Sequence, residues 1–272
     1  MDLNFNISVA AGYKSNAQKS RVITESWVRE NMYCPICGGP ILHQYIANRP
    51  VADFYCDKCK SDFELKSHEG QKSLPKIIPD GAYNTMIERI TSSNNPNLFV
   101  MGYADKKVAN LIFIPRFFFV PSVIVKRTPL KETARRAGWT GCNINIGLIP
   151  NDAKIKIIEN GIISPAESVI NQYQFIKSLE TNNIQARGWL MDTMSCIENI
   201  PSDYFTLKDL YNFEHLLKLK YPDNNFIQAK LRQHLQIFRS IYEERKERYE
   251  ARIQAMVDYV TTETVCRSRM LL

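Results

Sequence analysis

The sequence predicts a mixed α/β domain followed by a mostly helical domain. Apolar runs typical of strands lie at 97–104, 110–120, 122–127 and 154–158. In the last third of the chain, apolar residues recur only at helical spacing. We therefore place the first domain at 1–183 and the second at 187–272, with the polar stretch 178–188 as linker.

Length and composition are those of an ordinary globular protein: 272 residues, 44% hydrophobic and 23% charged. No apolar run approaches the roughly 18 residues that span a bilayer, and the first residues lack the pattern of a secretory leader. We expect a cytoplasmic protein without a membrane partner. The net charge is +7, and residues 1–186 carry 22 Lys and Arg against 16 Asp and Glu, which is compatible with a polyanionic partner.

Helices are predicted in both domains. In the first domain, one helix starts at Ser15 as its cap and another covers 82–93. In the second domain, Thr206 caps the middle one of three helices, which are expected at 188–200, 206–221 and 224–239. Three short helices with tight connections are typical of a helix-turn-helix module.

Two CxxC pairs form the strongest motif. They are separated by 18 residues and consist of Cys34, Cys37, Cys56 and Cys59. Each turn directs two thiolates to one point, and four thiolates complete a tetrahedral zinc site. Such a closed site is structural, because no coordination position is left for a substrate.

Acidic residues flank the second CxxC pair at hairpin spacing. If residues 56–61 form the tip of a β-hairpin, Asp53 lies opposite Glu64, and Lys66 projects from the same face. Opposed carboxylates repel each other unless a cation compensates them. Asp53, Glu64 and the carbonyl of Leu65 offer the hard oxygen ligands that suit Mg²⁺. Glu25 could also reach this metal, although we expect it at the surface.

An ordinary zinc ribbon with solvated charges has a similar pattern, since an Asp followed eleven positions later by E-x-K is a loose motif. The segments "RPVADFYC", "DFELK", "CPICG" and "TARRAGWTGCN" together are more specific. They resemble the DpnI-type methyl-directed restriction endonucleases, over about nine tenths of the chain.

This resemblance implies a restriction-endonuclease-like PD-(D/E)XK core with an inserted four-cysteine zinc site, followed by a winged-helix domain. It assigns Asp53, Glu64 and Lys66 as catalytic, and the four cysteines as zinc ligands. The implied substrate is double-stranded DNA with N6-methyladenine in GATC, and the implied host is prokaryotic. We expect a type II enzyme, a structural Zn²⁺, a catalytic Mg²⁺ and a monomer.

Candidate base-reading residues occur in both domains. Arg135, Arg136 and Trp139 lie on a glycine-punctuated loop, where an indole could pack a methyl group. In the last predicted helix, polar side chains recur along one face, namely Asn225, Gln228, Arg232, Gln236 and Arg239. Each set also has an ordinary structural alternative. For the loop, it is a salt-bridged pair of arginines beside a buried Trp, and for the helix, it is a solvated face. The tail 240–272 is atypical, because it lacks the glycine-containing turns of a wing.

Two other functions share most of these features. A non-catalytic regulator built from a zinc ribbon and a helix-turn-helix would not need Asp53, Glu64 and Lys66 on one face. An endonuclease indifferent to methylation would share that face and lack a methyl pocket. The position of Asp53 relative to Glu64 is therefore the decisive structural question.

Overall fold

The computed structural model describes residues 1–46, 52–70, 73–92, 95–202 and 204–240. Tertiary contacts divide the chain into two compact units, Met1–Tyr204 and Phe205–Leu272. Within the described ranges, no helix is both long and apolar enough to cross a membrane.

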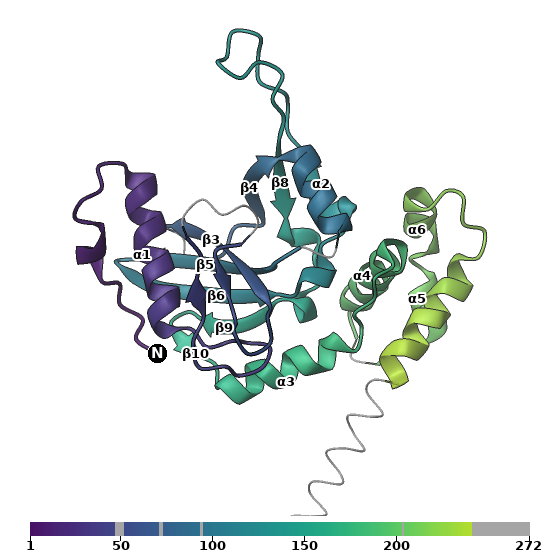
Figure 1. Cartoon of the computed structure of the whole chain (residues 1–272). Coiled ribbons are helices and arrows are strands. Elements are labelled where there is room, and N and C mark those ends of the chain that lie inside the picture. Colours follow the sequence, from purple (N-terminus) through teal and green to yellow (C-terminus); the bar gives the residue numbers. More distant parts are fainter. Residues whose placement is uncertain (47–51, 71–72, 93–94, 203, 241–272) are drawn as a thin grey trace, which may run out of the picture. The chain divides into compact units, whose positions relative to one another are not determined.

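A seven-stranded mixed sheet forms the centre of the first unit (Figure 1). Its order is β1-β2-β3-β5-β6-β9-β10; β3 and β5 run parallel, and the other neighbours are antiparallel. The strands are β1 (His43–Gln44), β2 (Phe54–Tyr55), β3 (Asp62–Glu69), β5 (Asn97–Ala104), β6 (Lys107–Ile114), β9 (Ile155–Glu159) and β10 (Ile162–Ile163). The predicted mixed α/β class is confirmed, and β5 has the predicted bounds.

The two faces of this sheet carry different kinds of side chain. Phe63, Phe99 and Phe113 form a buried row, with ring centroids 5.1 and 5.7 Å apart, and Tyr173 of α3 (Ala166–Lys177) packs against Phe113. Side chains alternate along a strand, so Glu64 and Lys66 project from the opposite face. Sequence analysis did not predict α3.

A second sheet contacts that opposite face. It has the order β4-β8-β7 and consists of β4 (Ile77–Ala82), β8 (Gly141–Asn145) and β7 (Ile124–Lys126), with α2 (Tyr83–Thr91) directly after β4. Sequence analysis missed β4, because Pro79, Asp80 and Gly81 are typical of a turn. These residues instead form a strand whose register shifts between Asp80 and Ala82.

The helix α1 (Asn16–Asn31) lies beside β3, where Thr24 Oγ1 donates to Ser67 Oγ (3.3 Å). Ser15 is its N-cap residue as predicted, but the Ser15 side chain makes no capping hydrogen bond. The end of the run 110–120, expected as a strand, turns into a 3₁₀ helix. The 3₁₀ helices are η1 (Ile7–Ala10), η2 (Arg116–Phe118), η3 (Pro121–Val123), η4 (Ile146–Leu148) and η5 (Asn151–Ala153).

The predicted linker 178–188 is wrong in its second half. Asn183 caps α4 (Ile184–Glu198) by accepting the N–H of Ala186. Arg187, only 8% exposed, donates to the carbonyls of Ile90 (3.3 Å) and Phe119 (3.5 Å). α4 therefore packs on the first unit, and the division by tertiary contacts falls after Tyr204.

In its described part, residues 205–240, the second unit contains helices joined by short turns and no strand. Its helices are α5 (Leu207–Tyr211), α6 (Glu214–Lys220) and one that begins at Ile227 and continues to the last described residue. Thr206 caps α5 as predicted, in a reciprocal capping box with Asp209. The expected single helix 206–221 is interrupted between α5 and α6, and the atypical tail lies outside the described residues beyond Ser240.

Candidate active site and metal centre

The two CxxC turns have nearly the same backbone conformation. Cys34 O accepts the N–H of Gly38 (2.9 Å), and Cys56 O accepts the N–H of Lys60 (2.9 Å). Gly38 and Lys60 both have positive φ, +70° and +59°. In each turn, the residue four positions after the first cysteine thus reverses the chain direction. The two thiols of that turn therefore point toward one centre.

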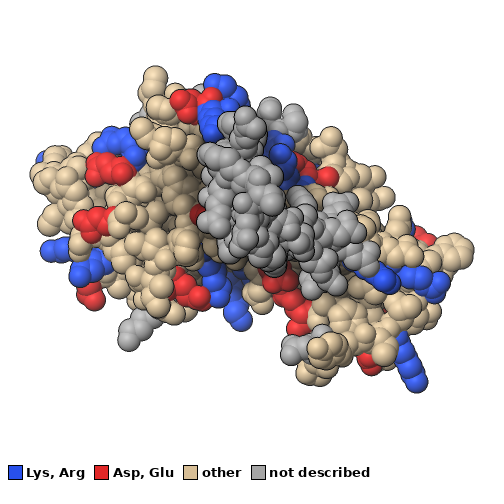
Figure 2. All heavy atoms as spheres, turned by 90° about the horizontal axis from the view of Figure 1, so that it is seen from below, with Lys and Arg blue, Asp and Glu red and all other residues tan. Residues whose placement is uncertain are grey.

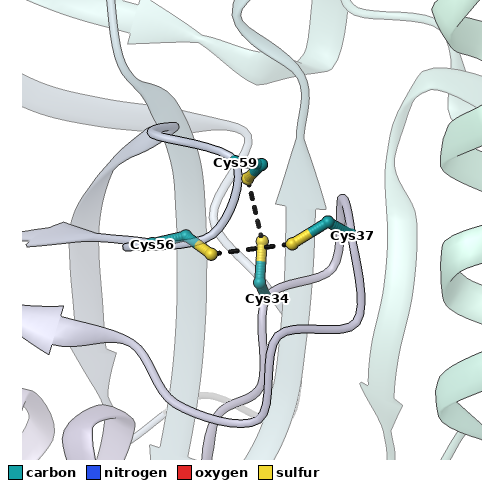
Figure 3. A group of neighbouring side chains, drawn as sticks. All are labelled: Cys34, Cys37, Cys56 and Cys59. Atoms are coloured by element: carbon teal, nitrogen blue, oxygen red, sulfur yellow. Dashed lines mark hydrogen bonds between the residues drawn. The ribbon is translucent and has the colours of Figure 1, made fainter.

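The four thiols meet at one point (Figure 3). All four sulfur atoms lie within 4.8 Å of one another, and the Cys34–Cys59 and Cys37–Cys56 pairs are each 3.6 Å apart. Tetrahedral zinc with bonds of about 2.3 Å places its sulfur ligands roughly 3.8 Å apart. Burial raises the pKa of the Cys34 thiol, so a cation is needed to hold it as a thiolate. The predicted zinc ligands therefore fit zinc in position, spacing and chemistry.

The hairpin has the predicted register. Phe54 pairs with Phe63 and Tyr55 with Asp62. One step further, Asp53 N–H donates to Phe63 O (2.9 Å), and Asp53 Oδ2 accepts the N–H of Leu65 (2.7 Å). The Asp53 carboxylate is thereby held against β3 beside Glu64.

Asp53 and Glu64 interact electrostatically. Burial raises the pKa of the Asp53 carboxyl and the Glu64 charge raises it further, while the Leu65 N–H and Lys66 act in the opposite direction. A divalent cation between the carboxylates would relieve this repulsion, and carboxylate oxygens are ligands that Mg²⁺ prefers. These residues fit a hard divalent cation.

Lys66 lies between two carboxylates. Its Nζ is 2.8 Å from Glu64 Oε1 and 2.8 Å from Asp80 Oδ1, while Arg89 Nη2 contacts Glu64 Oε2 at 3.1 Å. Burial alone would lower the pKa of Lys66, but the Glu64 and Asp80 charges outweigh it and raise that pKa above its ordinary value. Lys66 is therefore a fixed cation at neutral pH and is not suited to accept a proton.

Sequence reasoning missed Asp80 and Arg89. Asp80 Oδ1 also accepts the N–H of Gly81 (2.7 Å), and its buried Oδ2 has no partner among the described residues. Both residues come from the second sheet and its helix, and only tertiary packing brings them to Glu64 and Lys66. The signal that sequence analysis could have used was the position of Asp80, an acid two residues before the helix predicted at 82–93.

Glu25 is not at the surface, contrary to the expectation from sequence. It is 8% exposed and binds Arg21 (2.9 Å) and Gln44 Nε2 (2.9 Å). Burial raises the pKa of Glu25 and the Asp53 charge raises it further, against the opposing effect of Arg21. The buried side of α1 thus places a further acid, Glu25, close enough to Asp53 for the two charges to repel each other.

The predicted loop with Arg135, Arg136 and Trp139 extends the β7–β8 hairpin into a protruding ribbon (Figure 1). Leu130 N–H donates to Trp139 O (2.9 Å), which continues the pairing of the two arms. The Arg136 guanidinium lies 4.9 Å from the centre of the Trp139 ring. Trp139 is half-buried, whereas Arg135 and Arg136 are exposed. The structural alternative of a fully buried Trp is excluded.

Gly141 makes room for this indole. A Cβ at position 141 would lie 2.9 Å from Cη2 of Trp139 and 3.0 Å from Cζ3. The Cζ3–Cη2 edge of the ring therefore lies close to the Gly141 backbone, while the indole as a whole is only half-buried.

The candidate residues of the last helix are mostly exposed. Asn225, Arg232, Gln236 and Arg239 are exposed, and Gln228 is half-buried. Within the second unit, Gln228 donates to Glu214 (2.7 Å), Arg232 donates to Tyr211 (3.1 Å), and Asn225 accepts from Lys218 (3.0 Å). The opposite side of the helix is buried through Ile227, Leu231 and His234.

A restriction-type nuclease with a DNA-binding domain is the class of protein in which these features are expected together: a mixed sheet with two acids and a lysine on one face, a four-thiol cluster and a separate helical unit. Residues 1–182 match the model of the DpnI, Dam-replacing family, and residues 185–242 match that of the Dam-replacing HTH domain. The chain belongs to the DpnI, Dam-replacing family. The resemblance in the sequence is confirmed, and it implies a methyl-directed restriction endonuclease that acts on DNA.

Replacing Cys34 with Ser removes one sulfur from the cluster, so we expect loss of bound zinc and a lower melting temperature. Metal analysis of the purified protein by mass spectrometry, combined with thermal unfolding, measures both. Cys196→Ser is the matched control, because Cys196 is also buried but lies in α4 outside the cluster. Full zinc content in the Cys34→Ser variant would contradict the assignment of this ligand.

Replacing Asp80 with Asn removes a charge that holds Lys66, so we expect DNA cleavage to slow by about tenfold or more with little change in DNA binding. Single-turnover cleavage and a binding titration separate the two effects. Glu88→Gln in α2 is the control, since Glu88 is exposed. An unchanged cleavage rate in Asp80→Asn would show that Lys66 does not need this partner.

Proposed function

We propose that this protein is a type II, Mg²⁺-dependent endonuclease that cleaves double-stranded DNA at GATC sites containing N6-methyladenine. The observation that carries the proposal is the convergence of Asp53, Glu64 and Lys66 on one face of the central sheet. A zinc ribbon without catalysis has no need to bury two interacting carboxylates and a lysine together.

Asp53, Glu64 and the Leu65 carbonyl would hold the Mg²⁺, which when bound supplies charge neutralisation and polarises the phosphodiester. Lys66 is held as a cation by Asp80 and lies where it can stabilise negative charge that develops on the phosphate. Arg89 fixes Glu64 from the other side. None of the three catalytic residues is suited as a nucleophile for phosphorus, so water is the expected attacking group.

The β7–β8 ribbon is the candidate reader of the modified base. Residues 125–140 carry five Lys and Arg and only one acid, Glu132. Such an exposed cationic ribbon suits the phosphate backbone. The half-buried Trp139 ring offers an apolar surface for a methyl group in the major groove, where N6 of adenine is accessible.

The second unit would be a further reader of the same DNA. Asn225, Gln228, Arg232, Gln236 and Arg239 would contact the DNA through the exposed side of the last helix, since amide and guanidinium groups suit adenine and guanine edges. We also propose a cytoplasmic protein, because thiolates that bind zinc persist in a reducing compartment, and a prokaryotic host, which the family resemblance implies. The monomeric state remains a prediction.

Replacing Asp53 with Ala removes an expected metal ligand, so we predict loss of cleavage with retained binding to methylated duplex. Matched methylated and unmethylated plasmids, incubated with Mg²⁺, give the measurement. Asp57→Ala is the control, because the Asp57 side chain, in the second CxxC turn, is 65% exposed. Cleavage by the Asp53→Ala variant would refute the catalytic assignment. For the unmodified protein, scission of both plasmids would favour a methylation-insensitive nuclease, and scission of neither a non-catalytic regulator.

Replacing Trp139 with Ala removes the proposed methyl contact, so we expect the preference for methylated over unmethylated sites to fall by about tenfold. Cleavage rates on the two duplexes, measured side by side, give this ratio. Tyr204→Ala, which removes an aromatic ring that is 91% exposed, is the control. An unchanged ratio would place the reader elsewhere.

A further inference from the structure

A cleft of about 730 Å³ lies in the first unit, outside the candidate active site. Its floor consists of β6 and β9, and its walls come from residues 73–76 before β4, from η4 and from the segment after η5. This volume lies within the range of roughly 300–1,000 Å³ that is typical of small-molecule sites.

The cleft is predominantly cationic. Lys76, Lys154 and Lys156 line it, and Glu159, the one acid among its described lining residues, contacts Lys156 at 2.5 Å. Burial lowers the pKa of Lys154 and the charge of Lys76 lowers it further, against the opposing effect of Glu198. An anion in the cleft would relieve the repulsion between these lysines, so the geometry favours a negatively charged ligand.

Besides Ser73 and Gly147, the remaining lining consists of apolar and amide side chains. The apolar ones are Leu74, Pro75, Ile112, Ile146 and Ile158, and the amides are Asn110, Asn151 and Asn160. A simple inorganic anion would use only the lysines. An apolar floor with amides and lysines around it suits a flat ring with polar edges, joined to a phosphate.

The cleft is separate from the catalytic residues, although both lie on one face of the sheet. In register across the strands, Lys66 neighbours Val100, Val100 neighbours Ile112, and Ile112 neighbours Lys156. Three strand spacings correspond to about 14 Å between the ends of this row. Ile112 belongs to the cleft floor, and Val100, which is 1% exposed, lies between it and Lys66, so one covered strand position separates the two sites in this row.

We propose that this cleft binds a nucleoside monophosphate group, with the phosphate at Lys76, Lys154 and Lys156. The base would lie against Leu74, Pro75 and Ile112. The group is either a free nucleotide or the 5′-phosphorylated end of a DNA strand, which present the same chemistry. This proposal does not depend on the cleavage reaction, because none of the catalytic residues lines the cleft.

Calorimetric titration of the full-length protein with deoxyadenosine monophosphate, without added divalent metal, tests the proposal. We expect binding that weakens by about tenfold or more when Lys76, Lys154 and Lys156 are all replaced by Ala. Lys76→Glu, a single exposed reversal of charge, should weaken binding in the same direction if the triple variant fails to fold. Lys177→Ala in α3, exposed and outside the cleft, should bind normally.

Equal affinity of the unmodified protein and the Lys76→Glu variant, or no binding up to about 10 mM ligand, would overturn the proposal. Inorganic phosphate that binds as tightly as the nucleotide would overturn the nucleoside part. An unmethylated duplex with 5′-phosphates that displaces the nucleotide, when its 5′-hydroxyl counterpart does not, supports a DNA end as ligand. Retained nucleotide binding with no displacement by either duplex supports a free nucleotide.

Discussion

The pairing of β2 with β3 is the constraint on which the rest of the candidate site depends. β2 contains only Phe54 and Tyr55, so its few ladder hydrogen bonds hold the register weakly by themselves. Because side chains alternate, a slip of one residue would turn Asp53 away from Glu64. The CxxC turn that joins the strands, together with the buried Phe54 and Phe63, excludes such a slip. The four-thiol cluster thus sets the position of Asp53 relative to Glu64.

The charges around Glu64 form a nearly closed network. Lys66 and Arg89 hold the two oxygens of Glu64, and Asp80 holds Lys66 from the second sheet. Buried charges of this kind require partners with good geometry, because desolvation penalises each unpaired ion. The network therefore ties the central sheet to β4 and α2 and keeps Lys66 charged. In this arrangement, the second sheet supports the site, while its β7–β8 extension carries the cationic ribbon.

The sequence predicted the parts of the site that depend on local rules. The CxxC spacing determined the cluster, hairpin arithmetic placed Asp53 beside Glu64, and the apolar run 97–104 gave β5 its bounds. Failures occurred where tertiary packing overrode a local signal. Residues 79–81 look like a turn, yet they continue β4 past a bulge. The polar residues after 183 look like a linker, yet α4 buries Arg187 among backbone carbonyls of the first unit.

By itself, the sequence determined the four-thiol cluster, the mixed α/β class and the face shared by Asp53, Glu64 and Lys66, because each follows from spacing within a short segment. Only the tertiary structure decided that Asp80, Arg89 and Glu25 surround this face, and that three lysines gather in one cleft. Charged residues are spread along the whole chain, and on the face that Figure 2 shows both signs occur intermixed. Their convergence depends on how distant elements pack, which no local periodicity encodes.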